Sequence, residues 1–308
     1  MLVVLTGGTG GAKLIEGLAA ETDPAQLTIV CNTGDDCVFH GLHISPDIDT
    51  ITYTLAGLSD GEKGWGIKGD SFTVLEQLRR LGNDAWFNLG DKDIATHITR
   101  TRLMAEGLTL SQVTARIRAA LGVRAKILPM SDQRVETRVI TPEGEISFQE
   151  FFVKERYSRE VVAVHFCGAE RSQPAPGVLE AIRQSTAVII APSNPITSIG
   201  PILAVAEIRK ALQHSVVPVA AVSPIIGRTA ISGPAHRLMA ARGVEPSAYG
   251  VADGYRDLLK RFVIDTEDHH AKGRIEKLGI RVVESSIRLS SIADKRRLAR
   301  EVLALVKK

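Results

Sequence analysis

The chain has 308 residues, of which 44% are hydrophobic, and its formal net charge is only +3. This composition supports a substantial core and excludes an intrinsically disordered chain. No apolar run approaches the roughly 18 residues of a membrane span, and no basic segment precedes a long apolar one. We therefore expect a cytoplasmic protein without a membrane partner.

Cysteine usage and charge distribution exclude further classes. Cys31, Cys37 and Cys167 are odd in number and form no C-x-x-C pair, so neither a disulfide framework nor a zinc site is expected. The basic excess is concentrated in the C-terminal "DKRRLAREVLALVKK", where it fits the solvated face of an amphipathic helix. Nucleic-acid binding requires a stronger basic footprint, and we expect no such partner.

Short apolar runs that alternate with helical stretches define the fold class. Near-continuous apolar strands of this kind are typical of a parallel sheet covered by helices on both faces. The sequence therefore predicts an α/β, Rossmann-like core. The predicted strands are "LVVLT" (2–6), "LTIVCNT" (27–33), "WFNLG" (86–90), "AVIIAPS" (187–193), "VPVAAVSP" (217–224), "RFVID" (261–265) and "RVVES" (281–285).

A glycine-rich loop follows the first predicted strand. It contains Gly7, Gly8, Thr9 and Gly10, and Lys13 follows on the first helical turn. The spacing matches neither G-x-x-x-x-G-K-[ST] nor the complete G-x-G-x-x-G fingerprint. A tight strand-to-helix turn would explain some of these residues. So many small residues at the carboxyl end of a strand favour phosphate binding at the helix N-terminus.

The second strand ends in "CNTGDD", which places Asp35 and Asp36 at the same edge of the sheet. Adjacent carboxylates beside a phosphate loop suggest Mg²⁺, which is commonly held by one or two carboxylates together with substrate phosphates. An Asx-type turn with solvated acids explains the motif equally well. The motif alone leaves both interpretations open.

"HISPDIDTITYTLAGL" predicts a helix that begins near Asp47 and Asp49. An N-cap would account for one aspartate but hardly for two. If Asp47 caps the helix, Asp49 lies in its first turn, where its carboxylate would be free for a metal or a substrate hydroxyl.

Two further segments offer ligand contacts. Trp65 in "GWGIKGDSF" is either a core residue or an aromatic wall for a flat ring. "FNLGDKDIATHITR" supplies both signs of charge at a turn through Lys92 and its neighbouring aspartates, as a polyanionic substrate with its cation would need. His97, further along the same segment, is by itself more typical of a packed or surface histidine.

The rhythm changes between residues 124 and 168. "RVETRVITPEGEISFQEFF" contains two alternating strands around a Pro-Glu-Gly turn, which predicts an antiparallel insertion. We therefore expect a core made of residues 1–123 and 169–308, with 124–168 forming part of a small second lobe. The flanking helical segments 109–122 and 176–185 are candidates to join that lobe.

Polar loops also follow two strands of the second half. "APSNPITSIGPI" and "VSPIIGRTAISGP" are stiffened by prolines, and such rigidity suits recognition of a base or phosphate. Strands stopped by proline before capped helices would explain only part of the pattern. The candidate nucleotide-binding residues here are Ser193, Asn194, Thr197, Ser198, Gly200, Ser223 and Gly227.

Eight motifs occur in order along the chain: "GGTGGAKL", "NTGDD", "SPDIDT", "WGIKGDSF", "LGDKDIATHI", "ILPMSD", "PSNPITSIGPI" and "VSPIIG". Taken together, they closely resemble the 2-phospho-L-lactate transferase family of coenzyme F-420 biosynthesis. The matches run in order from residue 5 to about residue 235. The resemblance implies a dimeric, Mg²⁺-dependent enzyme with a Rossmann-like core and a smaller insertion.

The implied reaction joins two substrates. The ribityl hydroxyl of the deazaflavin Fo attacks the phosphorus of lactyl-2-diphospho-5′-guanosine or enolpyruvoyl-2-diphospho-5′-guanosine, and GMP leaves. The resemblance implies that Asp49 and Lys92, with Trp65 beside them, bind Fo, and that the glycine loop holds the diphosphate. Asp35, Asp36 and Asp49 are the candidate metal ligands, and Asp36 and Asp49 the candidate catalytic groups. Another magnesium-dependent nucleotidyl- or phosphotransferase, or a non-catalytic nucleotide-binding protein, remains the alternative.

Overall fold

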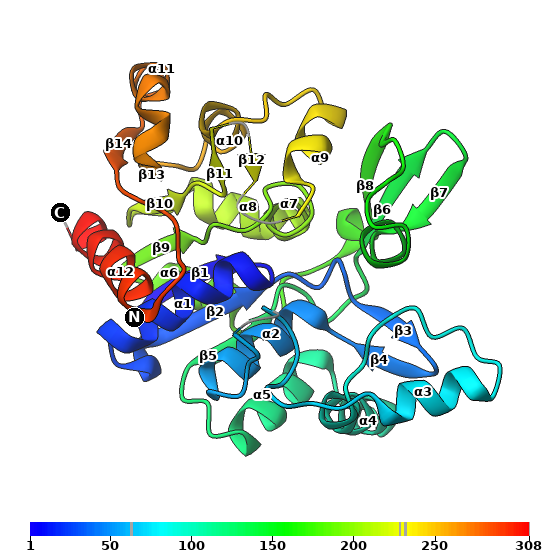
Figure 1. The fold of residues 1–308 in the computed structure, drawn as a ribbon. Helices are drawn as coiled ribbons and strands as arrows, with labels where there is room; N and C mark the ends of the chain where they lie inside the picture. The colour runs from blue at the N-terminus through cyan, green and yellow to red at the C-terminus, as the bar shows by residue number, and fades with distance from the viewer. Residues whose placement is uncertain (62–63, 228, 231–232, 308) are drawn as a thin grey trace.

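A parallel sheet forms the centre of the molecule (Figure 1). The computed structural model describes residues 1–61, 64–227, 229–230 and 233–307. Within these residues the sheet has the order β14-β13-β10-β9-β1-β2-β5, and every pairing in it is parallel. Its strands are β1 (Leu2–Thr6), β2 (Leu27–Cys31), β5 (Lys126–Pro129), β9 (Ala187–Ile190), β10 (Val219–Val222), β13 (Arg261–Ile264) and β14 (Arg281–Glu284).

Helices cover both faces of this sheet because the strands carry apolar side chains on both of their sides. Val4 packs into a core with α1, α2 and α12, whereas Val3 and Leu5 pack into a second core with α6 to α11. The helices are α1 (Thr9–Glu21), α2 (Pro46–Leu55), α3 (Thr73–Arg80), α4 (Asp91–Ala105), α5 (Leu110–Ala120), α6 (Val178–Gln184), α7 (Ile199–Ala204), α8 (Ala206–Gln213), α9 (Ala235–Ala241), α10 (Ala248–Gly254), α11 (Lys272–Glu276) and α12 (Ile292–Lys307). Short 3-10 segments lie at Pro24–Gln26, Ala169–Arg171 and Thr266–Ala271.

The strand order reverses at β1, whose neighbours are β2 on one side and β9 on the other. The connection after β1 leads to α1 on one face, and the connection after β9 leads to α7 on the other. The two loops therefore diverge and leave a crevice at the carboxyl ends of the strands. Open α/β sheets bind their ligands at such a switch point.

Two smaller units project on this same side of the sheet, opposite the chain termini (Figure 1). One is the hairpin β3 (Cys37–Phe39) and β4 (Leu42–Ile44) with α3 and α4. The other is an antiparallel sheet of β6 (Glu136–Thr141), β7 (Gly144–Ser147) and β8 (Ala163–Cys167), with a π-helix, η2 (Glu150–Lys154). A short pair, β11 (Ile225–Ile226) and β12 (Thr229–Ala230), follows β10.

The predicted Rossmann-like sandwich with an antiparallel insertion is confirmed, with three corrections. Residues 86–90 form no strand; Phe87 and Leu89 instead pack with Ile44 in a small cluster of their own. The insertion does not begin at residue 124, because β5 pairs with β2 in the central sheet and the antiparallel sheet begins at Glu136. The two flanking helices do not join the insertion. Helix α5 packs on β5 and on α4, and helix α6 packs on α8.

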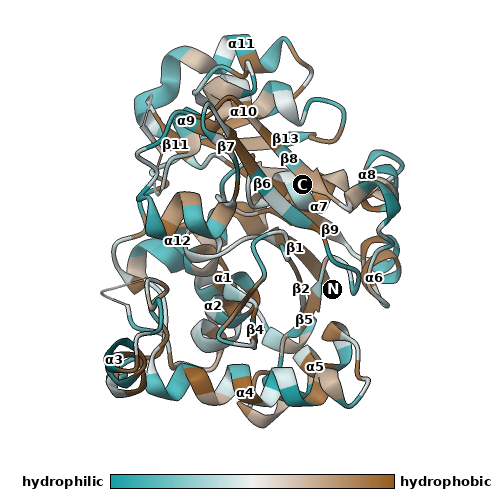
Figure 2. Cartoon of the chain, turned by 90° about the vertical axis from the view of Figure 1, so that its right-hand side faces the viewer, coloured by the Kyte–Doolittle hydropathy of each residue, from teal (hydrophilic) through white to brown (hydrophobic). Residues whose placement is uncertain are grey.

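Figure 2 views the molecule from the carboxyl side of the sheet and shows brown, hydrophobic strands between helices that carry teal, hydrophilic residues. In the described part of the chain, no helix combines the length and apolar character that crossing a bilayer requires.

Candidate functional site

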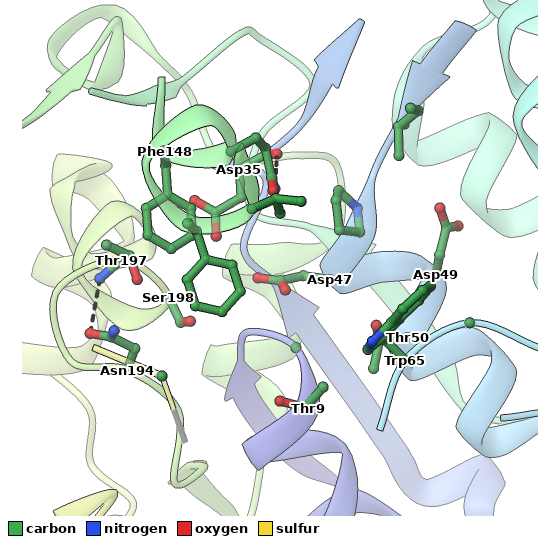
Figure 3. A pocket seen from close by; sticks show the side chains of 18 of the residues that line it. Thr9, Asp35, Asp47, Asp49, Thr50, Trp65, Phe148, Asn194, Thr197 and Ser198 are labelled. Carbon is green, nitrogen blue, oxygen red and sulfur yellow. Dashed lines mark hydrogen bonds between the residues drawn. The ribbon is translucent and has the colours of Figure 1, made fainter. Parts of the chain in front are cut away.

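A cavity of about 540 Å³ opens at the switch point of the sheet. Its walls come from the loops after β1, β2 and β9, from α2 and α4, and from both projecting units. Figure 3 shows its two sides, with Asn194, Thr197, Ser198, Asp35 and Phe148 on one and Asp49, Thr50 and Trp65 on the other. Asp47 lies between them, above Thr9.

The loops after β1 and β9 supply the wall at which a phosphate was predicted. Gly8, Thr9 and Gly10 line the cavity at the N-terminus of α1, and Ser193, Asn194, Thr197 and Ser198 line it from the β9 loop. The Gly7 N–H donates to Ser193 Oγ at 3.2 Å, so the two loops are bonded directly. A Cβ at Gly7 would lie 2.3 Å from Ser198 Oγ, which explains why this position requires glycine.

Asp47 occupies the centre of the cavity and does not cap α2. The N-cap position is Ser45, and Asp47 accepts hydrogen bonds from Asn32 Nδ2, at 2.9 Å, and from the Gly8 N–H. Asn32 Nδ2 also contacts the Thr197 carbonyl oxygen at 3.2 Å, so it joins the ends of β2 and β9 to α2. Burial raises the pKa of Asp47 to about 6, although both hydrogen bonds act in the opposite direction.

Asp35 and Asp36 differ in their access to the cavity. Asp35 lines it and is 7% exposed, whereas Asp36 is absent from its wall and accepts a hydrogen bond from Ser45 Oγ at 2.6 Å. Each carboxylate has one buried oxygen, Oδ1, without a partner among the described residues. Burial raises the pKa of both, and the charge of Asp47 adds to the effect on Asp35. Buried oxygens left unsatisfied in this way fit a cation site.

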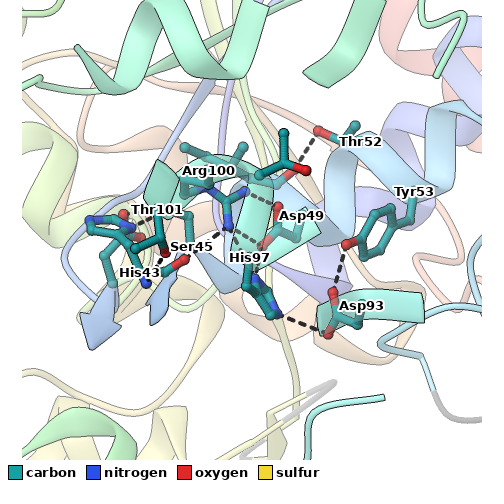
Figure 4. Close-up of polar contacts among 12 residues, drawn as sticks. His43, Ser45, Asp49, Thr52, Tyr53, Asp93, His97, Arg100 and Thr101 are labelled. Carbon is teal, nitrogen blue, oxygen red and sulfur yellow. Dashed lines mark hydrogen bonds and ion pairs between the residues drawn. The ribbon is translucent and has the colours of Figure 1, made fainter. Parts of the chain in front are cut away.

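The carboxylate of Asp49 is not free, contrary to the sequence-based expectation. Arg100, which is fully buried, donates to Asp49 through Nη1 at 3.0 Å to Oδ2 and through Nη2 to Oδ1 (Figure 4). Arg100 Nη1 also lies 3.2 Å from Nδ1 of His97. Asp49 nevertheless lines the cavity, so Arg100 fixes its orientation from behind.

The Asp49 pair continues into a chain of buried polar groups (Figure 4). His97 Nε2 lies 3.3 Å from Asp93 Oδ2, and the Tyr53 hydroxyl donates to Asp93 Oδ1 at 2.6 Å. Burial alone would raise the pKa of Asp93, but the hydrogen bonds and charges of its neighbours outweigh it and lower that pKa. Ligand atoms of Asp49, Asp93 and His97 lie within 4.8 Å of one another and could hold a metal ion.

The charge of the cavity wall is one-sided. Four aspartates line it, and no lysine or arginine does among the described residues; the acids are Asp35, Asp47, Asp49 and Asp93. A phosphate ester would meet these carboxylates, of which, in the described part of the chain, only Asp49 is paired with an arginine, Arg100, from behind the wall. Only the N–H groups at the start of α1 favour an anion, through the helix dipole and their unpaired donors.

Aromatic walls face each other across the opening. Trp65, 38% exposed, lines one side, and Phe148 and Phe152 line the other with ring centroids 5.4 Å apart in a stacked arrangement. Both phenylalanines come from the insertion, which sequence reasoning treated as structural only. The cavity therefore offers two places for flat rings.

Several predicted residues lie away from this cavity. Lys13 and Gly7 are absent from its wall, and the Lys92 amine donates to the carbonyl oxygens of Lys68, at 3.3 Å, and Gly69, at 3.0 Å. The Ser223 hydroxyl donates to the Ile225 carbonyl oxygen. Substrate roles for all these residues stay predictions.

Gly200 and Gly227 have structural roles in this conformation. A Cβ at Gly200 would lie 2.8 Å from Cζ of Phe166, so glycine permits the ring to pack against α7. Gly227 has φ +61° and donates its N–H to Asp268 at 3.0 Å. Neither lines the cavity at the switch point.

Comparison with known proteins decides the family. The sequence profile described as 2-phospho-L-lactate transferase CofD matches residues 2–291. The chain belongs to this family. It is 43% identical to a phosphoenolpyruvate transferase of Streptomyces griseus, with 99% of this chain and 98% of that protein covered. It is 42% identical to a 2-phospho-L-lactate transferase of Methanothermobacter thermautotrophicus, with 98% and 97% covered.

Membership makes the chain a transferase and sets aside the non-catalytic alternative. A UPF0052 family protein from Bacillus halodurans has the same fold, with a TM-score of 0.65 over 98% of both chains at 16% identity. Relatives of this CofD family member are named for both phospholactate and phosphoenolpyruvate transfer.

The sequence analysis gave His97 and Arg100 no role in the site and took Asp93 only as one of the charges beside Lys92, although a signal for all three existed. Positions 93, 97 and 100 follow the i, i+4, i+7 spacing that places side chains on one face of a helix. An acid, a histidine and an arginine together on one face of a helix indicate a buried polar network. What the sequence does not carry is the partner, Asp49, which is 51 residues away from Arg100.

Proposed function

We propose that the protein transfers a phospholactyl or phosphoenolpyruvyl group from a guanosine diphosphate conjugate to the ribityl hydroxyl of Fo, releasing GMP, in coenzyme F-420 biosynthesis. Family membership supports the transferred group, and relatives carry both names. The observation that carries the proposal is the cavity at the switch point, which combines a helix N-terminus, four carboxylates and two aromatic walls.

The donor is assigned to the side made by the β1 and β9 loops. Thr9 and Gly10 line the cavity at the N-terminus of α1, and their N–H groups are the proposed donors to the diphosphate, since the Gly8 N–H is bonded to Asp47. Ser193, Asn194, Thr197 and Ser198 offer hydroxyl and amide groups to the nucleoside. Phosphoryl-type transfer depends mainly on such positioning and on neutralising charge around phosphorus.

Mg²⁺ is the proposed cofactor, and the residues present fit it. Asp35 and Asp36 each have a buried oxygen without a partner, and no lysine or arginine lines the cavity, within the described residues. Asp49 keeps lone pairs for a cation even with Arg100 bound, since a carboxylate accepts about four contacts. Asp35, Asp36 and Asp49 are the proposed ligands, although Asp36 is absent from the cavity wall. Asp93 and His97 join the proposal because their ligand atoms lie within 4.8 Å of that of Asp49. An ion held there would neutralise charge on the transferring group.

The acceptor is assigned to the opposite side of the cavity. Trp65 provides a flat surface for the tricyclic ring, and Asp49 lies beside it (Figure 3). Arg100 holds both oxygens of Asp49, so this carboxylate orients the attacking hydroxyl rather than moving freely. A general base contributes only about 10²–10⁴-fold, so positioning and electrostatics are the larger part.

The direct test incubates the protein with Fo, Mg²⁺ and each candidate donor, followed by mass analysis of the products. The proposal requires a phospholactyl or phosphoenolpyruvyl ester of Fo together with GMP. Transfer to a different acceptor, or release of pyrophosphate in place of GMP, would favour another nucleotidyl- or phosphotransferase activity. The proposed homodimer is tested separately by analytical ultracentrifugation.

A further inference from the structure

A second cavity, of about 330 Å³, lies behind the loop that follows β9. Its walls come from β8, α7, α9 and α10 and from the loop itself. Met239, Val251 and Leu203 are buried and give it an apolar floor. The volume suits a small organic molecule rather than a single water or ion.

The charge of the second cavity is opposite to that of the first. Arg209 and Arg242 line it, and no aspartate or glutamate does within the described residues. Arg209 is paired with Asp257, at 2.7 Å. The Arg242 guanidinium lies over the Phe166 ring, 5.5 Å from its centroid, and no carboxylate in the described part of the chain pairs with it. Arg242 thus offers unused hydrogen-bond donors at the mouth of an apolar cavity.

A second polar group in this cavity lacks a partner. Tyr255 is 5% exposed, and its buried hydroxyl forms no hydrogen bond with any described residue. A buried hydroxyl without a partner costs free energy, and native structures rarely leave one unless a ligand or water completes it. Tyr255 lines the cavity, so a ligand there would supply the missing bond.

The two cavities share one loop. Pro195 and Ile196 face the second cavity, whereas Asn194 and Thr197, their neighbours in sequence, face the first. Asn194 Oδ1 accepts the N–H groups of Ile196, at 2.9 Å, and Thr197, at 3.3 Å, which makes this turn compact. A ligand in the second cavity would therefore contact the back of the wall that lines the first.

We propose that the second cavity is a binding site for a small organic anion with an apolar body. Its acidic group pairs with Arg242, and one of its acceptor atoms accepts the hydrogen bond of the Tyr255 hydroxyl. The apolar floor favours this class of ligand. So do the guanidinium without a carboxylate partner, the hydroxyl without a hydrogen bond and the lack of acids in the wall, as far as the described residues show. The site is separate from the proposed transferase function and does not depend on it.

The probe for the test is 8-anilinonaphthalene-1-sulfonate, an aromatic sulfonate whose fluorescence rises in apolar surroundings. The proposal requires saturable binding of one dye per chain. Arg242→Gln should weaken it about tenfold or more, because a charge-assisted hydrogen bond is lost. Tyr255→Phe should weaken dye binding about fivefold, because a hydrogen bond between neutral groups is lost. Gly254→Leu should weaken dye binding by narrowing the cavity, since Gly254 is an exposed residue that lines it and a Cβ there meets nothing within 4 Å, which leaves room for the larger side chain.

Two control variants distinguish the second cavity from other surfaces. Arg116→Gln removes an exposed arginine on α5, and Trp65→Ala alters the first cavity; both should leave dye affinity unchanged. Absence of saturable binding, or unchanged affinity in Arg242→Gln and Gly254→Leu, would overturn the proposal. Thermal unfolding of each variant checks the fold, and Tyr255→Phe keeps the test valid if Gly254→Leu does not fold.

Discussion

Two cavities lie on opposite sides of the loop after β9, and they carry opposite charge. The first is lined by four aspartates and by no lysine or arginine, the second by two arginines and no acid, among the residues that the structure describes. A phosphate ligand suits the first only together with a cation, whereas an organic anion suits the second by itself. The fold thus determines where the cavities are, and a few side chains determine what each accepts.

The two cavities also differ in the burial of the ion pairs beside them. Arg100 is fully buried against Asp49, while Arg209 pairs with Asp257 at the surface with about a third of each side chain exposed. Desolvation makes the buried pair expensive to break, because the remaining charge has no water to solvate it. The first cavity therefore depends on its network far more than the second depends on its surface pair.

The largest predicted effect is on stability. Arg100→Met should lower the free energy of unfolding by about 3–5 kcal/mol, because it leaves Asp49 buried without its partner. The matched variant Arg209→Met, which removes the exposed pair, should cost about 1 kcal/mol or less. Urea denaturation at pH 7 measures both. Equal losses in the two variants would contradict the difference between the buried and the exposed pair.

A second prediction concerns catalysis in the first cavity. Asp35→Asn should lower transfer about 10²–10³-fold, the range seen when one electrostatic contact to a transition state is lost. The dependence on Mg²⁺ concentration should shift to higher values in the same variant. Asp84→Asn, at an aspartate whose side chain is 70% exposed, is the matched control and should behave as wild type. Near-normal transfer by Asp35→Asn would exclude Asp35 from the site.

A smaller effect is predicted for the pH dependence of stability. The pKa of Asp47 is raised from 3.8 to about 6, so the folded state binds its proton more tightly than the unfolded state does. The contribution of Asp47 to the free energy of unfolding is fully present below pH 3.8 and is lost as the pH rises through 6. Without divalent cations, Asp47→Asn should therefore gain up to about 2 kcal/mol relative to wild type between pH 4 and pH 7.

The control for this prediction is to compare the stability of wild type with that of Asp47→Asn at each pH. His43, whose pKa burial lowers to about 4, acts in the opposite direction over part of the same range, but equally in both proteins. Thermal unfolding in EDTA at several pH values measures the difference. A gap between wild type and Asp47→Asn that does not change with pH would show that Asp47 is ionised throughout.

The sequence predicts the sheet well because its signals are local. Strands at 2–6, 187–190 and 261–264 are continuous apolar runs, and the glycine loop and the "PSNPITS" loop adjoin them. Phe87 and Leu89 gave a false strand because apolar alternation also fits an extended segment that packs without a pairing partner. Only tertiary structure distinguishes the two cases.

The chemistry of the site is less readable from the sequence because it depends on contacts between distant segments. Asp47 looked like a helix cap, yet it bonds Asn32 and Gly8, and Asp49 looked free, yet it pairs with Arg100. Among the described residues, the absence of lysine and arginine from the wall of the first cavity also emerges only in three dimensions, since Lys13 and Lys92 adjoin its motifs in sequence.

Calorimetric titration of GDP into the protein, once with Mg²⁺ and once with EDTA, tests most directly whether the acidic cavity takes a phosphate only together with a cation. We predict that removal of the ion weakens GDP binding about 100-fold or more, since the aspartates of the cavity wall would then face the diphosphate without a divalent charge between them. Equal affinity in Mg²⁺ and EDTA would contradict this assignment.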